Sequence, residues 1–410
     1  MVTMPIQSAF PIVITGHVDH GKSTLVGRLL YDTGTLQTER YQEMVQSSSE
    51  NGRADEFAFV LDAFEEERRR GITIDTSQIY FSSQLRPYVI IDTPGHREFI
   101  RNMVTGACYA KAAILLVDAV EGVMEQTRRH AWLLSIVGIQ DICVAVNKMD
   151  AAGYDADRYR ELTADINALL EEFSLTASAI VPISARHGEN VASRSKAMQW
   201  YQGPSLLELL DGLVCRPIEE RPFRFPVQDI YRFDGESVVV GRVESGSVRR
   251  GETVQLFPLG RQAVISAIRT FPATDVGTAS YGEAIGFTLD GSIDAGLVRG
   301  AVLCGGTLPS CGREFQATIF WFLNEYATGD PVTIRCTTQS VPGKIHLEQV
   351  FDPAQPDTEL PSDLICVGEA ARCSITTELD LVGDHPALIP EMGRFVIERD
   401  GIPAGAGIFR

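Results

Sequence analysis

The chain has 410 residues, which is long for a single hydrophobic core, so length alone indicates two or three domains. Its 44% hydrophobic and 22% charged residues are typical of a folded globular protein and exclude a disordered, collagenous or coiled-coil chain. The formal net charge of -18 argues against indiscriminate binding to nucleic-acid backbones, which depends on clustered Lys and Arg. Nucleic acid is therefore a disfavoured partner, although acidic proteins can bind RNA through shape and a few placed side chains.

The cysteines and the N-terminus indicate the compartment. The eight cysteines form no C-x-x-C pair and lie in apolar surroundings, which is typical of buried thiols in a reducing cytosol. The N-terminus lacks a basic region followed by a long apolar core, and the apolar stretches elsewhere are strand-sized. We therefore expect a cytoplasmic protein that is neither secreted nor membrane-spanning.

The first half of the chain alternates short β-branched runs with amphipathic segments. The runs are apolar on both faces, as strands of a helix-covered parallel sheet must be. Between the last two runs, apolar residues recur at helical spacing from Leu162 to Phe173. This pattern predicts an α/β doubly wound, mostly parallel domain over residues 1–216. Its strand-like runs are 12–16, 88–93, 112–119, 142–150 and 179–185.

The sequence pattern changes after a linker at 221–226. From there on, the chain consists of short strand-like runs separated by Gly and Asp. A second break at 308–312 leads into another strand-rich stretch. Neither stretch has a helical pattern of convincing length, so we predict two β-barrels, over 222–308 and 312–410. The Pro- and Asp-rich run 352–363 is expected to be an exposed loop.

The first motif, GHVDHGKS at 16–23, matches G-x-x-x-x-G-K-S and lies between a predicted strand and a predicted helix. Its glycines permit a tight loop whose backbone N–H groups, with the helix N-terminus behind them, surround phosphates. Lys22 is expected to reach the β- and γ-phosphates and Ser23 to bind Mg²⁺. The predicted nucleotide-binding residues here are Gly16, His17, Val18, Asp19, His20, Gly21, Lys22, Ser23 and Thr24.

The segment GITID at 71–75 follows a charged run, EEERRR at 65–70, which we interpret as a solvated helix face. A threonine at position 73 can close over the nucleotide and complete the Mg²⁺ shell only while the γ-phosphate is present. We therefore interpret the segment around Thr73 as a switch.

The segment DTPGH at 92–96 follows the second apolar run. Asp92 stands at a strand end near the phosphate loop, where it can hold Mg²⁺ through water. Gly95 can turn its N–H towards a γ-phosphate and flip when that phosphate leaves. His96 is expected to orient or polarise the attacking water.

The segment NKMD at 147–150 ends the next core run, and SAR at 184–186 ends the last. The Asp150 carboxylate can accept hydrogen bonds from guanine N1–H and the exocyclic amine, which adenine cannot offer. A backbone N–H of the second segment would bind guanine O6. The four motifs, each at the C-terminal end of a strand, predict a GTPase that binds GTP, GDP and Mg²⁺. The predicted base-pocket residues are Asn147, Lys148, Asp150, Ser184, Ala185 and Arg186.

Taken together, GHVDHGKS, RGITID, DTPGH and NKMD resemble the translation-factor class of GTPases, such as elongation factor Tu and its archaeal and eukaryotic counterparts, over nearly the whole chain. The resemblance implies a G domain followed by two β-barrels. It implies that Thr73 is the switch-one Mg²⁺ ligand and His96 the catalytic histidine. It also implies that Val18 and Ile72 form a hydrophobic gate that keeps the histidine off the water until activation.

Within that class, three stretches are most similar to the GTPase subunit of bacterial sulfate adenylyltransferase: QTRRH at 126–130, AMQWYQGP at 197–204 and the closing GRFVIERDGIPAGAGIF at 393–409. In the first, Arg129 stands where the elongation factors usually have an acid. This resemblance implies that GTP hydrolysis drives synthesis of adenosine 5′-phosphosulfate from ATP and sulfate. The expected partner is then a small ATP-binding sulfate adenylyltransferase subunit, in a heterodimer or higher assembly.

Two alternatives stay open. An elongation-factor-like GTPase that delivers aminoacyl-tRNA to the ribosome predicts a basic path across all three domains and an adenine pocket on the second barrel. The second alternative is a GTPase that regulates another adenylyltransferase. In all three cases intrinsic hydrolysis should be slow, because a partner usually completes the transition-state site of such switches.

Overall fold

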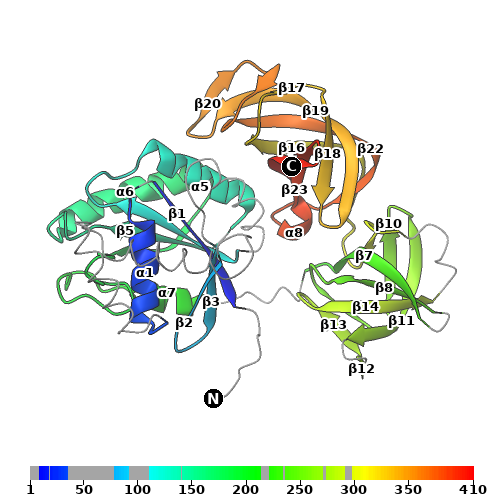
Figure 1. Ribbon diagram of the computed structural model, residues 1–410, viewed down its shortest axis with the longest axis horizontal. Coiled ribbons are helices and arrows are strands. Elements are labelled where there is room, and N and C mark those ends of the chain that lie inside the picture. Colours follow the sequence, from blue (N-terminus) through cyan, green and yellow to red (C-terminus); the bar gives the residue numbers. More distant parts are fainter. Residues whose placement is uncertain are drawn as a thin grey trace, which may run out of the picture. The chain divides into compact units, whose positions relative to one another are not determined.

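The computed structural model describes residues 9–17, 19–35, 78–91, 110–139, 141–213, 221–233, 236–270, 274–290 and 298–410. The chain divides into two compact units, Met1–Cys215 and Arg216–Arg410, which are drawn in Figure 1. Across the described ranges, no helix is long and apolar enough to cross a membrane. The finer domain limits expected from the sequence stay predictions.

The first unit is built on a six-stranded sheet in the order β2-β3-β1-β4-β5-β6. Its strands are β1 (Phe10–Gly16), β2 (Gln78–Ser82), β3 (Pro87–Ile91), β4 (Ala112–Asp118), β5 (Asp141–Asn147) and β6 (Ala177–Pro182). All neighbouring strands pair in parallel except β2, which is antiparallel to β3 at the edge. The central strands β1, β4 and β5 are buried nearly throughout, which confirms the doubly wound sheet predicted from runs that are apolar on both faces.

Helices pack against this sheet through apolar stripes. They are α1 (Lys22–Asp32), α5 (Glu125–Val137), α6 (Ala156–Glu172) and α7 (Leu206–Gly212). Leu25 and Leu29 of α1 share one core with Leu206 of α7 and the inner residues of β1 and β4. Helix α6 begins after Asp155, whose carboxylate accepts the backbone N–H of Asp157. Of the predicted apolar stripe, Leu162, Ile166, Leu169 and Leu170 are buried on α6, and Phe173, which caps the helix, is half-buried.

The first half of the second unit is a closed antiparallel barrel in the order β10-β15-β7-β8-β14-β11, which the pairing of β10 with β11 closes. Its strands are β7 (Arg224–Phe233), β8 (Glu236–Arg242), β10 (Thr253–Phe257), β11 (Arg261–Thr270), β14 (Ala284–Asp290) and β15 (Val302–Cys304). Of the short strands, β12 (Thr274–Asp275) pairs with β11, and β9 (Ser247–Arg249) pairs with β13 (Thr278–Ser280) in a separate two-stranded sheet. The core contains Phe225 and Phe287, whose rings meet edge to face at 4.6 Å.

A second closed barrel follows in the order β18-β23-β24-β16-β22-β19, which the pairing of β18 with β19 closes. Its strands are β16 (Ser310–Trp321), β18 (Pro331–Cys336), β19 (Gln339–Asp352), β22 (Ala370–Gly383), β23 (Arg394–Arg399) and β24 (Ile402–Phe409). The smaller elements are β17 (Tyr326–Ala327), β20 (Gln355–Leu360), β21 (Leu364–Ile365) and the one-turn helix α8 (Pro390–Gly393). The two barrels confirm the predicted all-β second half.

One local prediction was wrong. Residues 352–363 are not a loop throughout, because β20 pairs with the end of β19 as an antiparallel hairpin. The Asp352 carboxylate accepts the backbone N–H of Ala354 and so closes the turn. Cys311 is exposed, whereas Cys143, Cys304, Cys336 and Cys373 are buried as expected.

A buried ion pair joins the two barrels of the second unit. Arg224 at the start of β7 and Asp384 just after β22 form two parallel bonds, Nε to Oδ2 at 2.8 Å and Nη2 to Oδ1 at 3.0 Å. Both side chains are almost completely buried. The remaining guanidinium bonds go to the carbonyls of Phe223, Gly305 and Thr307. Every donor of the guanidinium is therefore engaged, as a buried cation requires.

Candidate nucleotide-binding site

The loop between β1 and α1 carries the predicted phosphate motif. Gly21 is the N-cap of α1 and has a φ of 90°, a left-handed conformation that favours glycine. A Cβ at this position would lie 2.5 Å from Nδ2 of Asn147. Glycine is therefore required both for the turn and for the close approach of Asn147 to the loop.

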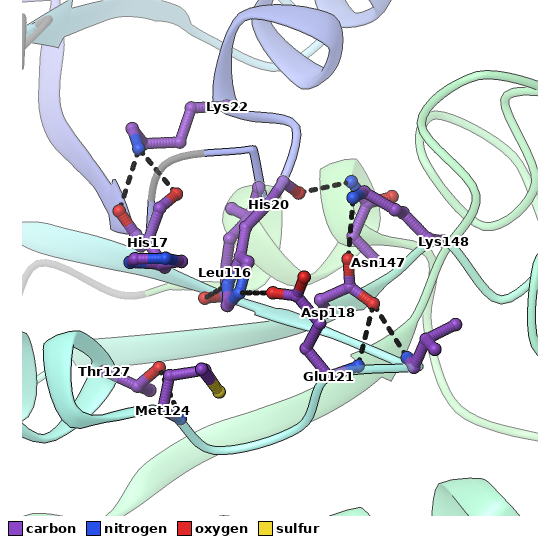
Figure 2. A network of polar contacts seen from close by, with 12 residues as sticks. His17, His20, Lys22, Leu116, Asp118, Glu121, Met124, Thr127, Asn147 and Lys148 are labelled. Atoms are coloured by element: carbon purple, nitrogen blue, oxygen red, sulfur yellow. Dashed lines mark hydrogen bonds and ion pairs between the residues drawn. The ribbon is translucent and has the colours of Figure 1, made fainter.

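Lys22 at the first turn of α1 folds back across the loop. Its Nζ donates to the carbonyls of Gly16 at 2.8 Å and His17 at 2.9 Å (Figure 2). The ammonium thus lies beside the N-terminus of α1, where unpaired backbone N–H groups favour an anion. Ser23 and Thr24 follow it in the first turn of the helix. This arrangement suits the phosphate-binding role expected of the loop.

The buried ring of His20 supports the loop from within. Its Nδ1 lies 3.3 Å from the carbonyl oxygen of Leu116 at the end of β4, and its Nε2 lies 3.2 Å from a carboxylate oxygen of Glu121 (Figure 2). Burial lowers the pKa of His20, against the opposing influence of the Leu116 carbonyl and the Asp118 charge. The imidazole therefore anchors the loop to the end of β4, and Asp19 beside it is exposed.

Asn147 at the end of β5 joins two loops. Its side-chain amide nitrogen donates to the carbonyl of His20 at 2.8 Å, and its oxygen accepts the backbone N–H of Ala185 at 2.9 Å. The side chain is 2% exposed. The sequence predicted that Asn147 lines the base pocket, and the described contacts add that it ties the phosphate loop to the turn after β6.

Lys148 follows in a left-handed conformation, with a φ of 62°. Its Nζ lies 2.7 Å from Oδ2 of Asp118, the last residue of β4, whose side chain is 2% exposed (Figure 2). The other carboxylate oxygen accepts the backbone N–H groups of Val120 and Glu121. Burial alone would raise the pKa of Asp118, but Lys148 and these two N–H groups outweigh it and lower the pKa.

Asp118 was not among the site residues predicted from the sequence, although its position in the chain indicated such a role. It is a carboxylate at the C-terminal end of a buried strand that neighbours β5, which is where ligands of a parallel sheet gather. Without the sheet order, nothing connects it with Lys148.

Asp150 and the turn after β6 form the predicted base-reading end. Ser184 donates its hydroxyl to Oδ1 of Asp150 at 2.6 Å, which fixes the orientation of the carboxylate. Burial, followed by the negative charges of Asp150 and Glu189, raises the pKa of the nearby Tyr154 phenol. The structure thus brings Asp150 and Ser184 together as predicted, whereas the side chain of Arg186 is exposed.

Part of the predicted site lies outside the described residues. The residues concerned are Val18, Ile72, Thr73, Asp92, Gly95 and His96. The gate, the catalytic histidine and two of the three Mg²⁺ ligands stay predictions for this reason. Over the described ranges, no group of three or more His, Cys, Asp or Glu side chains is arranged to hold a metal ion.

The stretch 126–130 lies within helix α5. Arg129 lies on α5 and pairs with Glu125 one turn earlier at 2.8 Å, and both side chains are well exposed. Such i,i+4 pairs contribute about 0.3–0.5 kcal/mol. The arginine at this position therefore has a structural role, as one half of a pair on the surface of α5.

The two other stretches are explained by packing. In the stretch 197–204, Trp200 donates its indole N–H to the carbonyl of Tyr154 at 2.9 Å, and its ring packs on Tyr159. In the closing stretch, Phe395 and Phe409 pack their rings together in the core of the second barrel at a centroid distance of 4.8 Å. Both patterns are therefore accounted for by the fold.

Two family profiles match the chain. The elongation factor Tu GTP binding domain matches residues 7–216, and a GTP-eEF1A C-terminal domain-like profile matches residues 314–410. Elongation factor 1-alpha of Methanopyrus kandleri is 38% identical over 97% of this chain and 96% of its own length. The same protein of Pyrococcus furiosus is also 38% identical with the same coverage. A solved structure of sup35 complexed with GDP aligns with 98% of this chain and 94% of its own at 24% identity and a TM-score of 0.45.

These matches correct one expectation from the sequence. Relatives similar over nearly the whole chain are elongation factors, and the expected small ATP-binding sulfate adenylyltransferase subunit is wrong as a partner. The similarity of three short stretches to the sulfate adenylyltransferase subunit is likewise outweighed by the similarity of the full length.

Proposed function

The chain belongs to the translation-factor class of GTPases that carry the elongation factor Tu GTP-binding domain, and on this premise we propose that it delivers aminoacyl-tRNA to the ribosome. It binds GTP and GDP, with Mg²⁺ as the usual partner ion of such a site. The GTP-bound form is the carrier, and hydrolysis ends the interaction. This activity belongs to the cytoplasm, where we expect the protein to work.

The carrier role is supported by the similarity to elongation factor 1-alpha over nearly the whole chain. The observation that carries the nucleotide part of the proposal is the junction made by Asn147, which links the phosphate loop at His20 to the base-reading turn at Ala185. The loop expected to bind the phosphates and the turn expected to bind the base are therefore linked through one side chain. Asp150, oriented by Ser184, offers a carboxylate that matches the donor edge of guanine. Selection of guanine nucleotides follows from this matching of donors and acceptors.

The hydrolytic step is assigned to residues of the phosphate loop together with residues outside the described ranges. We propose that His96 orients the attacking water and that Thr73, Asp92 and Ser23 hold Mg²⁺ while the γ-phosphate is present. Lys22 would neutralise charge on the phosphates from its position across the loop. Val18 and Ile72 would form the gate. His96→Ala should then leave GTP binding nearly intact and lower turnover, and full turnover in that variant would remove the assignment.

The nucleotide part of the proposal is tested by Asp150→Asn, which replaces one acceptor oxygen with a donor. We expect this variant to prefer xanthosine triphosphate over GTP, measured as competition for a fluorescent nucleotide. Asp157→Asn is the matched control, because Asp157 lies on α6 with its side chain 84% exposed. Unchanged preference for GTP in Asp150→Asn would remove the assignment of the base pocket.

The carrier part is tested with aminoacyl-tRNA. Binding to an elongation factor shields the aminoacyl ester, so the rate of spontaneous deacylation reports the complex. We expect slower deacylation with a non-hydrolysable GTP analogue than with GDP. If the analogue-bound protein neither binds the tRNA nor slows deacylation, the carrier role is wrong, while the Asp150 experiment still decides guanine binding.

One observation favours a second candidate, a GTPase switch that regulates a protein partner such as another adenylyltransferase. Several exposed arginines of the two barrels are paired with carboxylates, which reduces the positive surface available to RNA. The pairs are Arg250–Asp275, Arg269–Glu236, Arg313–Asp380, Arg335–Glu398 and Arg399–Asp330. A protein captured by the analogue-bound form, together with failure of the deacylation assay, would support this second candidate.

A further inference from the structure

The two oxygens of the Asp150 carboxylate have different neighbours. Oδ1 accepts the hydroxyl of Ser184 at 2.6 Å. Oδ2 faces Nε2 of His187 at 3.7 Å, and the His187 side chain is 51% exposed. An imidazole thus stands beside the oxygen that is not held by Ser184.

The turn that carries His187 is held in place by its backbone. Gly188 donates its N–H to the carbonyl of Ser184 at 2.8 Å, and Ala185 donates to the side chain of Asn147. Gly188 has a φ of 76°, and a Cβ there would lie 2.3 Å from the guanidinium carbon of Arg28 on α1. Because the turn is packed against α1 and bonded to β5, the exposed imidazole keeps its place near the carboxylate.

From this geometry we propose that His187 is a specificity-determining residue of the guanine site. As an imidazolium it engages Oδ2 of Asp150 and competes with the exocyclic amine of guanine, and as a neutral imidazole it leaves that oxygen to the base. The inference rests on the proposed base-reading role of Asp150. Guanine selectivity should therefore weaken in acid, because the competing donor is charged there.

The other charged side chains near this turn have ion-pair partners of their own. Lys148 is paired with Asp118, and Arg28 is paired with Asp32 on the same helix. The pKa of the Tyr154 phenol is raised, first by burial, so the phenol remains neutral. Histidine is the side-chain type whose ordinary pKa lies near neutrality, and His187 is the histidine that faces Oδ2 of Asp150.

The test compares the affinities of the full-length protein for GDP and for inosine diphosphate, which lacks the exocyclic amine. The ratio of the two affinities isolates the base, because both ligands have the same diphosphate and any effect of His17 or His20 on the phosphates cancels. We expect the ratio to be about two- to fivefold smaller at pH 5.5 than at pH 7.5, the range that an exposed charge pair supports.

Two variants of His187 and one control complete the design. His187→Gln should hold the ratio at its neutral-pH value throughout, and His187→Lys should hold it at the low value throughout. His346→Gln, at an exposed histidine of the second barrel, should behave as the unmodified protein. A ratio that does not change with pH in the unmodified protein, or that falls equally in His187→Gln, overturns the inference while leaving guanine binding established. Failure to bind any guanine nucleotide overturns the proposed function and this inference together.

Discussion

The side-chain amide of Asn147 donates to the backbone carbonyl of His20 across 2.8 Å, although the two residues are 127 positions apart in the chain. The oxygen of the same amide accepts the N–H of Ala185. One buried side chain thus fixes the distance between the loop expected to hold phosphates and the turn expected to hold the base. Nucleotide affinity should depend on this junction more than on either loop alone.

Asn147→Ala leaves the carbonyl of His20 and the N–H of Ala185 without a partner, each at a cost of about 1–3 kcal/mol. We expect GDP to dissociate at least about ten times faster, since RT ln 10 is about 1.4 kcal/mol. Stopped-flow displacement of fluorescent GDP measures the rate. Asn190→Ala is the control, because Asn190 also bridges two backbone groups, the buried carbonyl of Pro182 and the part-buried N–H of Ser195. Equal acceleration in both variants would show a general loss of stability instead.

Asp118 should make the first unit sensitive to acid. Its pKa is lowered in the folded protein, so it contributes stability above the ordinary carboxylate range, and that contribution is lost as the pH falls through the folded pKa. Asp118→Asn should lower the free energy of unfolding by about 1–2 kcal/mol at neutral pH, a figure discounted because Lys148 is partly exposed.

The measurement is the urea midpoint of the first unit at several pH values, followed by the fluorescence of Trp132 and Trp200. The unmodified protein should lose stability below about pH 4, and Asp118→Asn should show a flatter profile there. Asp157→Asn, at an exposed position, should change neither the midpoint nor the profile. Parallel profiles for the unmodified protein and Asp118→Asn would contradict the assignment.

Arg86 should stabilise the C-terminal end of α7, the last described helix of the first unit. Its guanidinium donates to the carbonyls of Leu210, Asp211 and Leu213 and lies 4.3 Å from the centre of the Phe10 ring. Arg86→Ala should lower the free energy of unfolding of this unit by about 2–3 kcal/mol, because three part-buried carbonyls lose a charged donor.

The same urea experiment measures this effect. Arg86→Lys should recover only part of the loss, since an ammonium cannot reproduce the planar fork of donors. Arg160→Ala is the control, because the Arg160 side chain on α6 is 70% exposed. A loss no larger than that of the control would mean that these contacts of Arg86 contribute nothing measurable.

Removing one partner of the ion pair between Arg224 and Asp384 should strongly lower the free energy of unfolding of the second unit. Asp384→Leu leaves a guanidinium that is 0% exposed without its carboxylate, which should cost about 3–5 kcal/mol. Replacing both residues by leucine removes the uncompensated charge and should recover most of this loss. The midpoint of the second unit, followed by Trp321 fluorescence, measures the difference. A double variant as unstable as Asp384→Leu would contradict the reasoning.

The fold was largely predictable because its signals are local. Runs that are apolar on both faces marked β1, β3, β4, β5 and β6, and the helical stripe from Leu162 marked α6. Strand β2 was missed because it is an edge strand in which Ile79 and Phe81 are buried and Tyr80 is 55% exposed, so it lacks a continuous apolar run. The hairpin of β20 was missed because its residues are polar and mostly exposed.

By itself the sequence determined the class of protein and the candidate residues of its nucleotide site, because a phosphate loop and a base-reading segment are short motifs whose chemistry depends on adjacent residues. Only the tertiary structure decided which polar groups pair across the chain: Lys148 with Asp118, and His20 with Glu121. Those pairings depend on the order of strands in the sheet and on which side chains are buried. Neither is written in the spacing of residues along the chain, since burial in a shared core is a property of the assembled fold.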